Sequence, residues 1–215
     1  MTRAIRLATL AGVAALASGA SADAILSFGF TDLAGTYDHT AGSFSAVDDA
    51  DTSGDVTRLE PPISSANYDV GFSGGTAAAS FVVSVFNKVG SLAQGMGSFS
   101  IVDADGDVLS GDITGTWISS GLGIFFNGDL SNVAFTLSGN GMFDGPSGGS
   151  FDPSFSGTPP YEGALVQLFV PPSSNFFNSD FTVDSVEVSG EIIPTPGALA
   201  LVGMAGIAGL RRRRS

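Results

Sequence analysis

Acidic side chains at a regular spacing are the residues of this chain best suited to chemistry. From Asp49 to Glu60 the sequence fits the twelve-residue pattern of a calcium-binding loop, with glycine at the sixth position and an apolar residue at the eighth. Ca²⁺ takes about six to eight hard oxygen ligands, and this spacing supplies them around one turn. The expected ligands are Asp49, Asp51, Ser53, the carbonyl of Asp55, and Glu60. The pattern therefore predicts a calcium site.

The residues that flank this segment favour a different interpretation. A calcium loop of the EF-hand type is held between two helices. Here Pro61 and Pro62 follow Glu60 directly, and the residues before Asp49 have the pattern of a strand or a turn. A solvated acidic turn would match the same pattern by chance in a chain rich in aspartate. Both interpretations stay open at the level of sequence.

A second acidic turn is a weaker candidate for the same ion. It contains Asp103, Asp105 and Asp107, with Asp112 nearby. Carboxylates so close together repel one another unless a cation or water shields them. The turn lacks the glycine and glutamate positions of the loop pattern, and turns rich in Asp and Gly also form for backbone reasons alone. Calcium is the one cofactor that the sequence indicates.

Catalytic patterns are weaker still. Gly145 to Gly149 fits the Gly-x-Ser-x-Gly pattern around Ser147, but it lies in a Gly/Ser-rich stretch where such matches are frequent. His39 is the single histidine, which excludes zinc sites built from several histidines. We therefore expect no enzyme. Trp117 is either a core residue or, with the three tyrosines, part of a sugar-stacking surface.

Composition and charge narrow the classes of function. Glycine at 30, phenylalanine at 17 and only 13% charged residues are typical of short apolar strands joined by glycine-rich turns. Away from the ends of the chain, Arg58 and Lys88 stand alone against all 21 acidic residues. Phosphates are bound through Lys and Arg, so we expect no nucleic acid partner. The chain has no cysteine, which excludes thiol chemistry.

Both ends of the chain have the pattern of a targeting signal, and we call them the address segments. Residues 1–22 place Arg3 and Arg6 before an apolar run and end in small residues, which predicts a helical signal peptide cleaved before Asp23. At the other end a proline break leads into an apolar segment and then a basic cluster. We expect this segment to form a short hydrophobic helix that anchors the chain in a membrane, with the basic residues kept inside. The break is Pro194, Thr195, Pro196 and Gly197, and the cluster is Arg211, Arg212, Arg213 and Arg214.

This arrangement over residues 194–215 resembles the PEP-CTERM sorting signal, in a variant that reads Pro-Thr-Pro-Gly. The resemblance implies that an exosortase-type transpeptidase is a partner and cuts near the proline motif. It also implies that the protein is exported to the cell surface or the extracellular matrix, where carriers of such signals are associated with extracellular polysaccharide and biofilm.

The middle of the chain, residues 23–193, is expected to form one all-β domain. Apolar stretches of strand length alternate with Gly, Asp, Asn, Ser and Pro, as in an antiparallel β-sandwich of jelly-roll or similar type. We expect tight turns at Asp103 to Asp107, at Asn127-Gly128-Asp129 and at Asn140-Gly141. The predicted strands are 80–87, 97–102, 112–118, 123–126, 132–137, 164–170 and 182–192.

The sequence therefore leads to one expected function and two alternatives. The expected function is an exported structural or binding protein of the cell surface or matrix, sorted by its C-terminal signal. The first alternative is a module that binds extracellular polysaccharide and is stabilised by calcium. The second alternative is a secreted hydrolase, which requires a catalytic cleft.

Overall fold

The computed structural model describes residues 23–171 and 176–194, and every regular element in them is a β-strand. All the strand pairs are antiparallel, so the predicted all-β class is confirmed. The strands are β1 (Leu26–Asp38), β2 (Ser43–Val47), β3 (Ser53–Arg58), β4 (Ser64–Tyr68), β5 (Ala78–Ser84), β6 (Phe86–Val89), β7 (Leu92–Val102), β8 (Val108–Ser120), β9 (Gly123–Thr136), β10 (Phe143–Asp144), β11 (Ser150–Phe151), β12 (Tyr161–Val170) and β13 (Phe181–Ile193).

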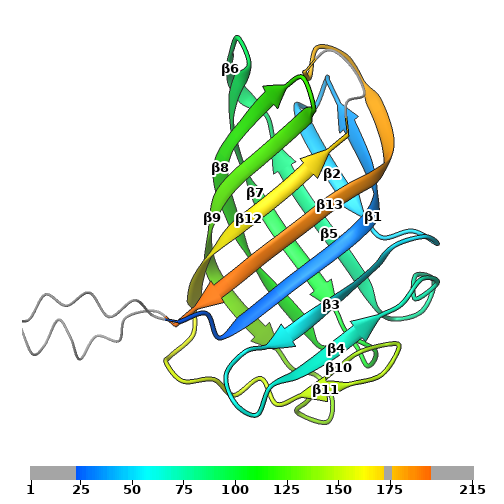
Figure 1. The fold of residues 1–215 in the computed structure, drawn as a ribbon, viewed down its shortest axis with the longest axis vertical. Helices are drawn as coiled ribbons and strands as arrows, with labels where there is room; N and C mark the ends of the chain where they lie inside the picture. The colour runs from blue at the N-terminus through cyan, green and yellow to red at the C-terminus, as the bar shows by residue number, and fades with distance from the viewer. Residues whose placement is uncertain (1–22, 172–175, 195–215) are drawn as a thin grey trace, which may run out of the picture.

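The predicted sandwich is wrong, because the sheet closes on itself. The first long strand, β1, pairs with the last, β13, from Leu26 opposite Ile192 to Tyr37 opposite Phe181. The other edge of β1 pairs with β3 along its first half and with β2 along its second half. The result is an eight-stranded antiparallel barrel in the order β1, β13, β12, β9, β8, β7, β5, β2 (Figure 1). A sandwich would have left the edges of β1 and β13 unpaired.

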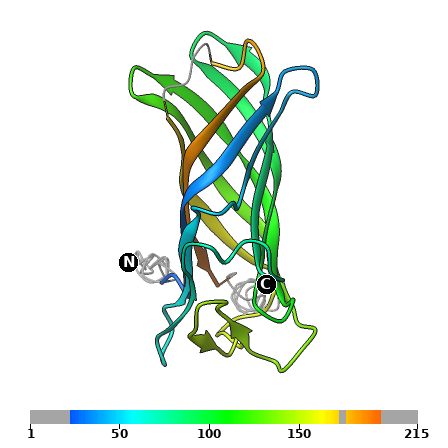
Figure 2. The ribbon, with the colours of Figure 1, turned by 90° about the vertical axis from the view of Figure 1, so that its right-hand side faces the viewer.

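The two ends of the barrel differ. At the lower end in Figures 1 and 2, β3 and β4 extend the sheet beyond the ring, and β10 and β11 lie beneath it. At the upper end, β6 pairs with β7 alone. The chain enters β1 and leaves β13 at the lower end, where the Ile25 N–H donates to the Ile192 carbonyl at 2.8 Å. Both predicted address segments are therefore attached beside the lower end.

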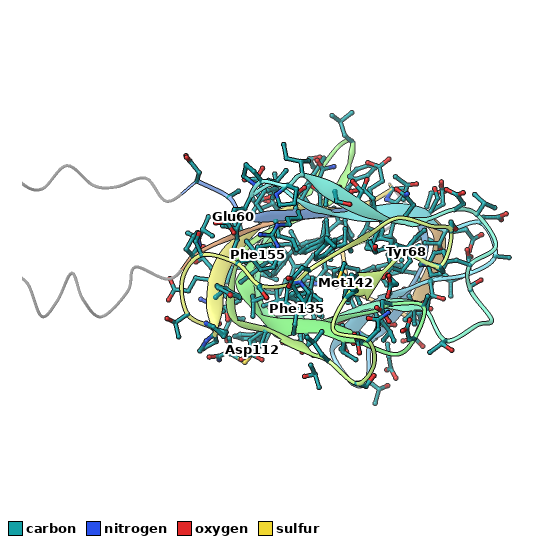
Figure 3. All side chains as sticks on the ribbon, turned by 90° about the horizontal axis from the view of Figure 1, so that it is seen from below. Glu60, Tyr68, Asp112, Phe135, Met142 and Phe155 are labelled. Carbon is teal, nitrogen blue, oxygen red and sulfur yellow. The ribbon has the colours of Figure 1, made fainter. Side chains whose placement is uncertain are left out.

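Residues 137–160, here called the lower cap, cover the lower end of the barrel (Figure 3). The Asn67 N–H of β4 donates to the Gly148 carbonyl, and the Ser147 N–H donates back to the Asn67 carbonyl, both at 3.0 Å. Phe143 and Phe151 are buried in the cap, and the Phe143 ring lies 5.4 Å from the ring of Phe135 in β9. The segment between Phe143 and Pro160 therefore contributes apolar side chains to the core.

Phe176, Phe177 and Asn178, here called the upper cap, cover the upper end. The Phe177 ring lies 4.6 Å from the Tyr37 ring and 5.0 Å from that of Trp117. The ammonium of Lys88 in β6 donates to the Phe176 carbonyl at 3.0 Å and also to the Asn178 side chain. Both ends of the barrel are thus closed by aromatic side chains and polar contacts.

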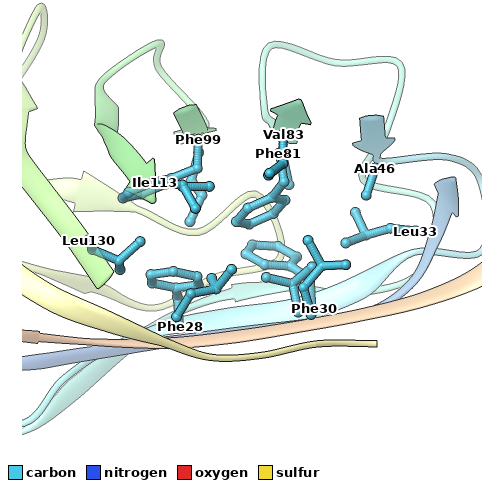
Figure 4. Close-up of a cluster of buried hydrophobic side chains, with 14 of the residues drawn as sticks. Phe28, Phe30, Leu33, Ala46, Phe81, Val83, Phe99, Ile113 and Leu130 are labelled. Carbon is cyan, nitrogen blue, oxygen red and sulfur yellow. The ribbon is translucent and has the colours of Figure 1, made fainter. Parts of the chain in front are cut away.

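Apolar side chains fill the space between the caps. On alternating positions of each strand they point inward, as Phe81 and Val83 do in β5, while Val82 points out and is exposed (Figure 4). The rings of Phe28, Phe81 and Phe99 stack on one another at 5.3–6.1 Å. Burying one such side chain fully stabilises the fold by roughly 1.5–3 kcal/mol. The interior of the barrel is a packed core.

Two turn predictions had different outcomes. The Asp103 to Asp107 turn joins β7 to β8, as predicted. The turn expected at Asn127-Gly128-Asp129 is wrong, because these residues lie inside β9 and pair with β8 and β12. Gly128 is required there for close packing, since a Cβ would stand 2.7 Å from the Thr114 carbonyl. The predicted strands 123–126 and 132–137 are therefore one long strand.

The predicted helices at the two ends, in residues 1–22 and in the segment after Pro194, lie outside the described residues. Within the described residues, we find no helix with the length and hydropathy needed to cross a membrane.

Candidate functional site

The segment from Asp49 to Glu60 does not gather its predicted ligands into one site. Asp49 to Thr52 form a turn in which the Asp49 carboxylate accepts the Asp51 N–H at 2.9 Å. From Ser53 onward the chain is extended, because β3 pairs with β1 on one edge and with β4 on the other. At about 3.3 Å per residue, the six residues of β3 separate their two ends by roughly 17 Å. A calcium loop of the predicted shape is therefore not formed.

Glu60, the last ligand of that pattern, has other partners at the lower end of the barrel. Its carboxylate accepts the Ser156 N–H at 2.9 Å and lies 3.5 Å from the Arg58 guanidinium. The hydrogen bonds from the Ser156 hydroxyl and N–H hold the pKa of Glu60 below its usual range, and the charge of Arg58 adds to this effect. Glu60 thus joins β3 to the lower cap.

The second acidic turn is tightly ordered. The Asp103 N–H donates to the Asp107 carbonyl at 2.9 Å, which closes the hairpin between β7 and β8. One oxygen of the Asp103 carboxylate, Oδ1, accepts the N–H groups of Asp105, Gly106 and Asp107 at 2.8–2.9 Å. Gly106 has a φ of +96°, which is favourable only for glycine. The sequence Asp-Ala-Asp-Gly-Asp thus fixes three carboxylates on one short turn.

Asp144 of β10 completes the cluster and was missed in the sequence. Its N–H donates to Asp103 Oδ2 at 2.8 Å, and its carbonyl accepts the Ala104 N–H at 2.9 Å. Carboxylate oxygens of Asp103, Asp105 and Asp144 all lie within 4.8 Å of one another. We call Asp103, Asp105, Asp107 and Asp144 the acidic centre. Asp112, which sequence proximity placed near this turn, instead accepts a hydrogen bond from Asn132 on the outside of the barrel.

Asp107, like Asp103, has no exposed surface. Its Oδ1 accepts the hydroxyl and N–H of Ser138 and, at 3.1 Å, the N–H of Gly139. Its other oxygen, Oδ2, is buried and has no hydrogen-bond partner among the described residues. A buried carboxylate oxygen without a partner is costly, by about 1–3 kcal/mol or more for a charged group.

The neighbouring carboxylates of the acidic centre disfavour the ionised form of Asp105. Partial loss of hydration and the charges of Asp103, Asp144 and Asp107 together raise the pKa of Asp105. The described residues contain only Arg58 and Lys88 as strong bases, and both bind elsewhere, in the lower and the upper cap. Several carboxylate oxygens within a few ångströms are the donor set that hard divalent cations prefer. Of the residues predicted as ligands, the structure brings Asp103 and Asp105 into one cluster, together with Asp144.

The residues of the catalytic pattern lie at opposite ends of the barrel. Ser147 is in the lower cap, where its hydroxyl accepts the Asp69 N–H at 2.8 Å. His39 follows the upper end of β1, where its N–H donates to Asp180. The thirteen residues of β1 lie between these ends, about 40 Å along the strand. The two side chains therefore cannot act on one substrate.

The aromatic residues considered for sugar stacking are all inside the protein. Trp117, Tyr37, Tyr68 and Tyr161 are each buried, and the Trp117 indole N–H donates to the Ser84 carbonyl at 3.0 Å. A groove of about 370 Å³ lies on the outside of β1, β3, β12 and β13. Its lining mixes polar and apolar groups, and the polar side chains include Asp55, Gln167 and Glu187.

Comparisons with protein-family models, with curated proteins and with solved structures found no match. The predicted sorting motif begins at Pro194, the last described residue, while Thr195, Pro196, Gly197 and Arg211 to Arg214 lie outside the described part of the chain.

Proposed function

We propose that this chain is an exported, non-catalytic protein of the cell surface or extracellular matrix, in which a rigid acidic barrel is delivered by the two address segments. The observation that carries the proposal is the filled and capped barrel. Enzymes and small-molecule carriers with this architecture work in a cavity or a cleft. Here buried side chains occupy the interior, and the caps cover both ends. Binding surfaces would therefore be on the outside.

The charge of the barrel supports the same proposal. Its two strong bases hold the caps, so the remaining surface is dominated by carboxylates. Such a surface stays soluble, repels anionic polymers and attracts cations. These properties suit a protein held in a hydrated matrix rather than one that binds nucleic acid.

The points at which the two address segments join the barrel imply an orientation of the barrel relative to a membrane. Both are attached at the lower end of the barrel, where Ile25 and Ile192 are hydrogen-bonded neighbours. An anchor after Pro194 would therefore hold the lower end toward the membrane and present the upper cap outward. Release by an exosortase-type transpeptidase near Pro196 would free the barrel into the matrix.

Mass spectrometry of the protein recovered from intact cells tests this proposal. We expect the recovered chain to begin at Asp23, or at Ile25 if cleavage follows Ala24, and to lack the residues after Pro196. A protein found in the cytoplasm with Met1 and with the Arg211 to Arg214 cluster intact would contradict both export and sorting. Arg211 to Arg214 retained on an exported chain would contradict processing alone.

A further inference from the structure

We propose that the acidic centre binds a divalent cation, Ca²⁺, and that this ion fastens the lower cap to the barrel. The site would take oxygen ligands from the turn between β7 and β8 and from β10. It goes beyond the proposed function and does not depend on export or sorting.

The first argument is the free oxygen of Asp107. This carboxylate has no exposed surface, and Oδ2 is without a partner while Oδ1 accepts three hydrogen bonds. Gly139 is close to both carboxylates: its N–H donates to Asp107 Oδ1, and a Cβ on it would stand 3.2 Å from Asp105 Oδ2. Asp107 and Asp105 therefore share Gly139 as a neighbour, and the charge of Asp107 acts on the Asp105 carboxylate. Buried charges of this kind are normally paired or bound to a metal ion.

The second argument is the absence of a protein cation that could do this work. Arg58 donates to the carbonyls of Glu60 and Asp152, and Lys88 donates to Phe176 and Asn178. Among the described residues, neither base forms an ion pair with the acidic centre. The three clustered carboxylates of Asp103, Asp105 and Asp144 thus have no strong base among the described residues to balance their charge.

The third argument is the kind and origin of the ligands. Every candidate donor is a carboxylate oxygen, which favours Ca²⁺ or Mg²⁺ over metals that prefer nitrogen or sulfur. Ca²⁺ accepts irregular geometry and varied numbers of ligands, whereas Mg²⁺ demands a near-octahedral arrangement. Asp103 and Asp105 belong to the barrel and Asp144 to the lower cap, so one ion would bridge the two.

Thermal unfolding with Ca²⁺, with Mg²⁺ and with chelator tests the proposal. A ligand that binds only the folded protein raises Tm, by roughly 5–10 °C at one hundred times Kd for a domain of this size. Asp105→Asn removes an exposed ligand whose side chain makes no hydrogen bond that the structure records, and it should lose most of the shift. Asp51→Asn, an exposed aspartate of the other acidic turn, is the matched control and should keep it.

Several results would overturn the proposal. Equal Ca²⁺ shifts in Asp105→Asn and Asp51→Asn would mean general screening of an acidic surface. No shift in the wild-type protein at millimolar Ca²⁺ would exclude the site, and an equal shift with Mg²⁺ would overturn the choice of ion. Should Asp105→Asn fail to fold, Tb³⁺ luminescence of the wild-type protein provides the test instead. Ca²⁺ should displace bound Tb³⁺ and lower the luminescence, and luminescence that Ca²⁺ leaves unchanged would overturn the proposal.

Two further readouts separate a cation site from a structural role of its residues. Asp107→Asn replaces a charged, unpaired oxygen by a neutral group, so it should raise Tm in chelator while it reduces the Ca²⁺ shift. Hydrogen exchange should slow in β10 and β11 on adding Ca²⁺ and stay unchanged in the upper cap. Equal slowing at both ends, or a fall in Tm of Asp107→Asn in chelator, would contradict the proposed bridge.

Discussion

At the scale of residues, Arg58 and Lys88 each hold one cap on the barrel through hydrogen bonds. The Arg58 guanidinium is nearly buried, donates to the Asp152 and Glu60 carbonyls, and lies 4.9 Å above the Phe155 ring. Lys88 makes the corresponding contacts with Phe176 and Asn178 at the other end. Each of the two basic side chains therefore helps to hold one end of the barrel closed.

Glu60 gives a prediction about pH at this scale. The folded protein holds the Glu60 proton more weakly than the unfolded chain, in which a glutamate has a pKa of about 4.3. The ionised carboxylate therefore stabilises the fold above that pH, and this contribution disappears as the pH falls through the lower pKa of the folded state. Urea unfolding of wild type and Glu60→Gln should show a stability difference at pH 7 that shrinks below about pH 4. A difference independent of pH would contradict the hydrogen bonds from Ser156.

The sequence predicted part of the acidic centre. Asp103, Asp105 and Asp107 were recognisable because they share one short turn. Asp144 was not recognisable, because only the fold brings it next to that turn. Its one local signal was an Asp before Gly145. The better match to a calcium pattern, from Asp49 to Glu60, was misleading because the pattern describes spacing along the chain and not the conformation.

At the scale of elements, strand pairing overrides local motifs. The Ser53 to Glu60 segment could have curled around an ion, but valine and threonine in β3 and a free edge on β1 favour extension. Strand pairing also overrides the turn predicted at Asn127 to Asp129, because β8 and β12 pair with the two edges of β9. Alternation predicted where strands lie, but it did not predict where a strand continues through a turn-like sequence.

The upper cap supports a prediction at this scale. Phe177 is almost fully buried among Tyr37, Trp117 and Phe181, so Phe177→Ala leaves a cavity at the end of the core. We expect a loss of about 3–5 kcal/mol in the free energy of unfolding, measured in urea. Leu122→Ala, at an exposed position in the turn between β8 and β9, is the control and should change stability by less than about 0.5 kcal/mol. Equal effects would mean that the cap does not pack as described.

At the scale of the whole molecule, closure distinguishes the observed barrel from the predicted sandwich. Both architectures have the same alternation and similar turns, so the strands alone could not distinguish them. The deciding contact joins Leu26 to Ile192, at the two ends of the folded domain. No local signal reports a pairing so distant in the chain. Closure also makes the interior a sealed core, and this is the basis for proposing a function on the outer surface.

Cross-linking across the closing seam tests this central claim most directly. Cα atoms of directly opposite residues in antiparallel strands lie about 4.5–5.5 Å apart, within reach of a disulfide or a short bifunctional maleimide. The natural chain has no cysteine, so only introduced pairs can react. Ser27 faces Glu191 across the β1–β13 seam and faces Thr57 in β3, and these two pairs provide the test and the control. We predict that Ser27→Cys with Glu191→Cys links, as does Ser27→Cys with Thr57→Cys. Free thiols in the first variant, beside a linked second variant, would contradict the closed barrel.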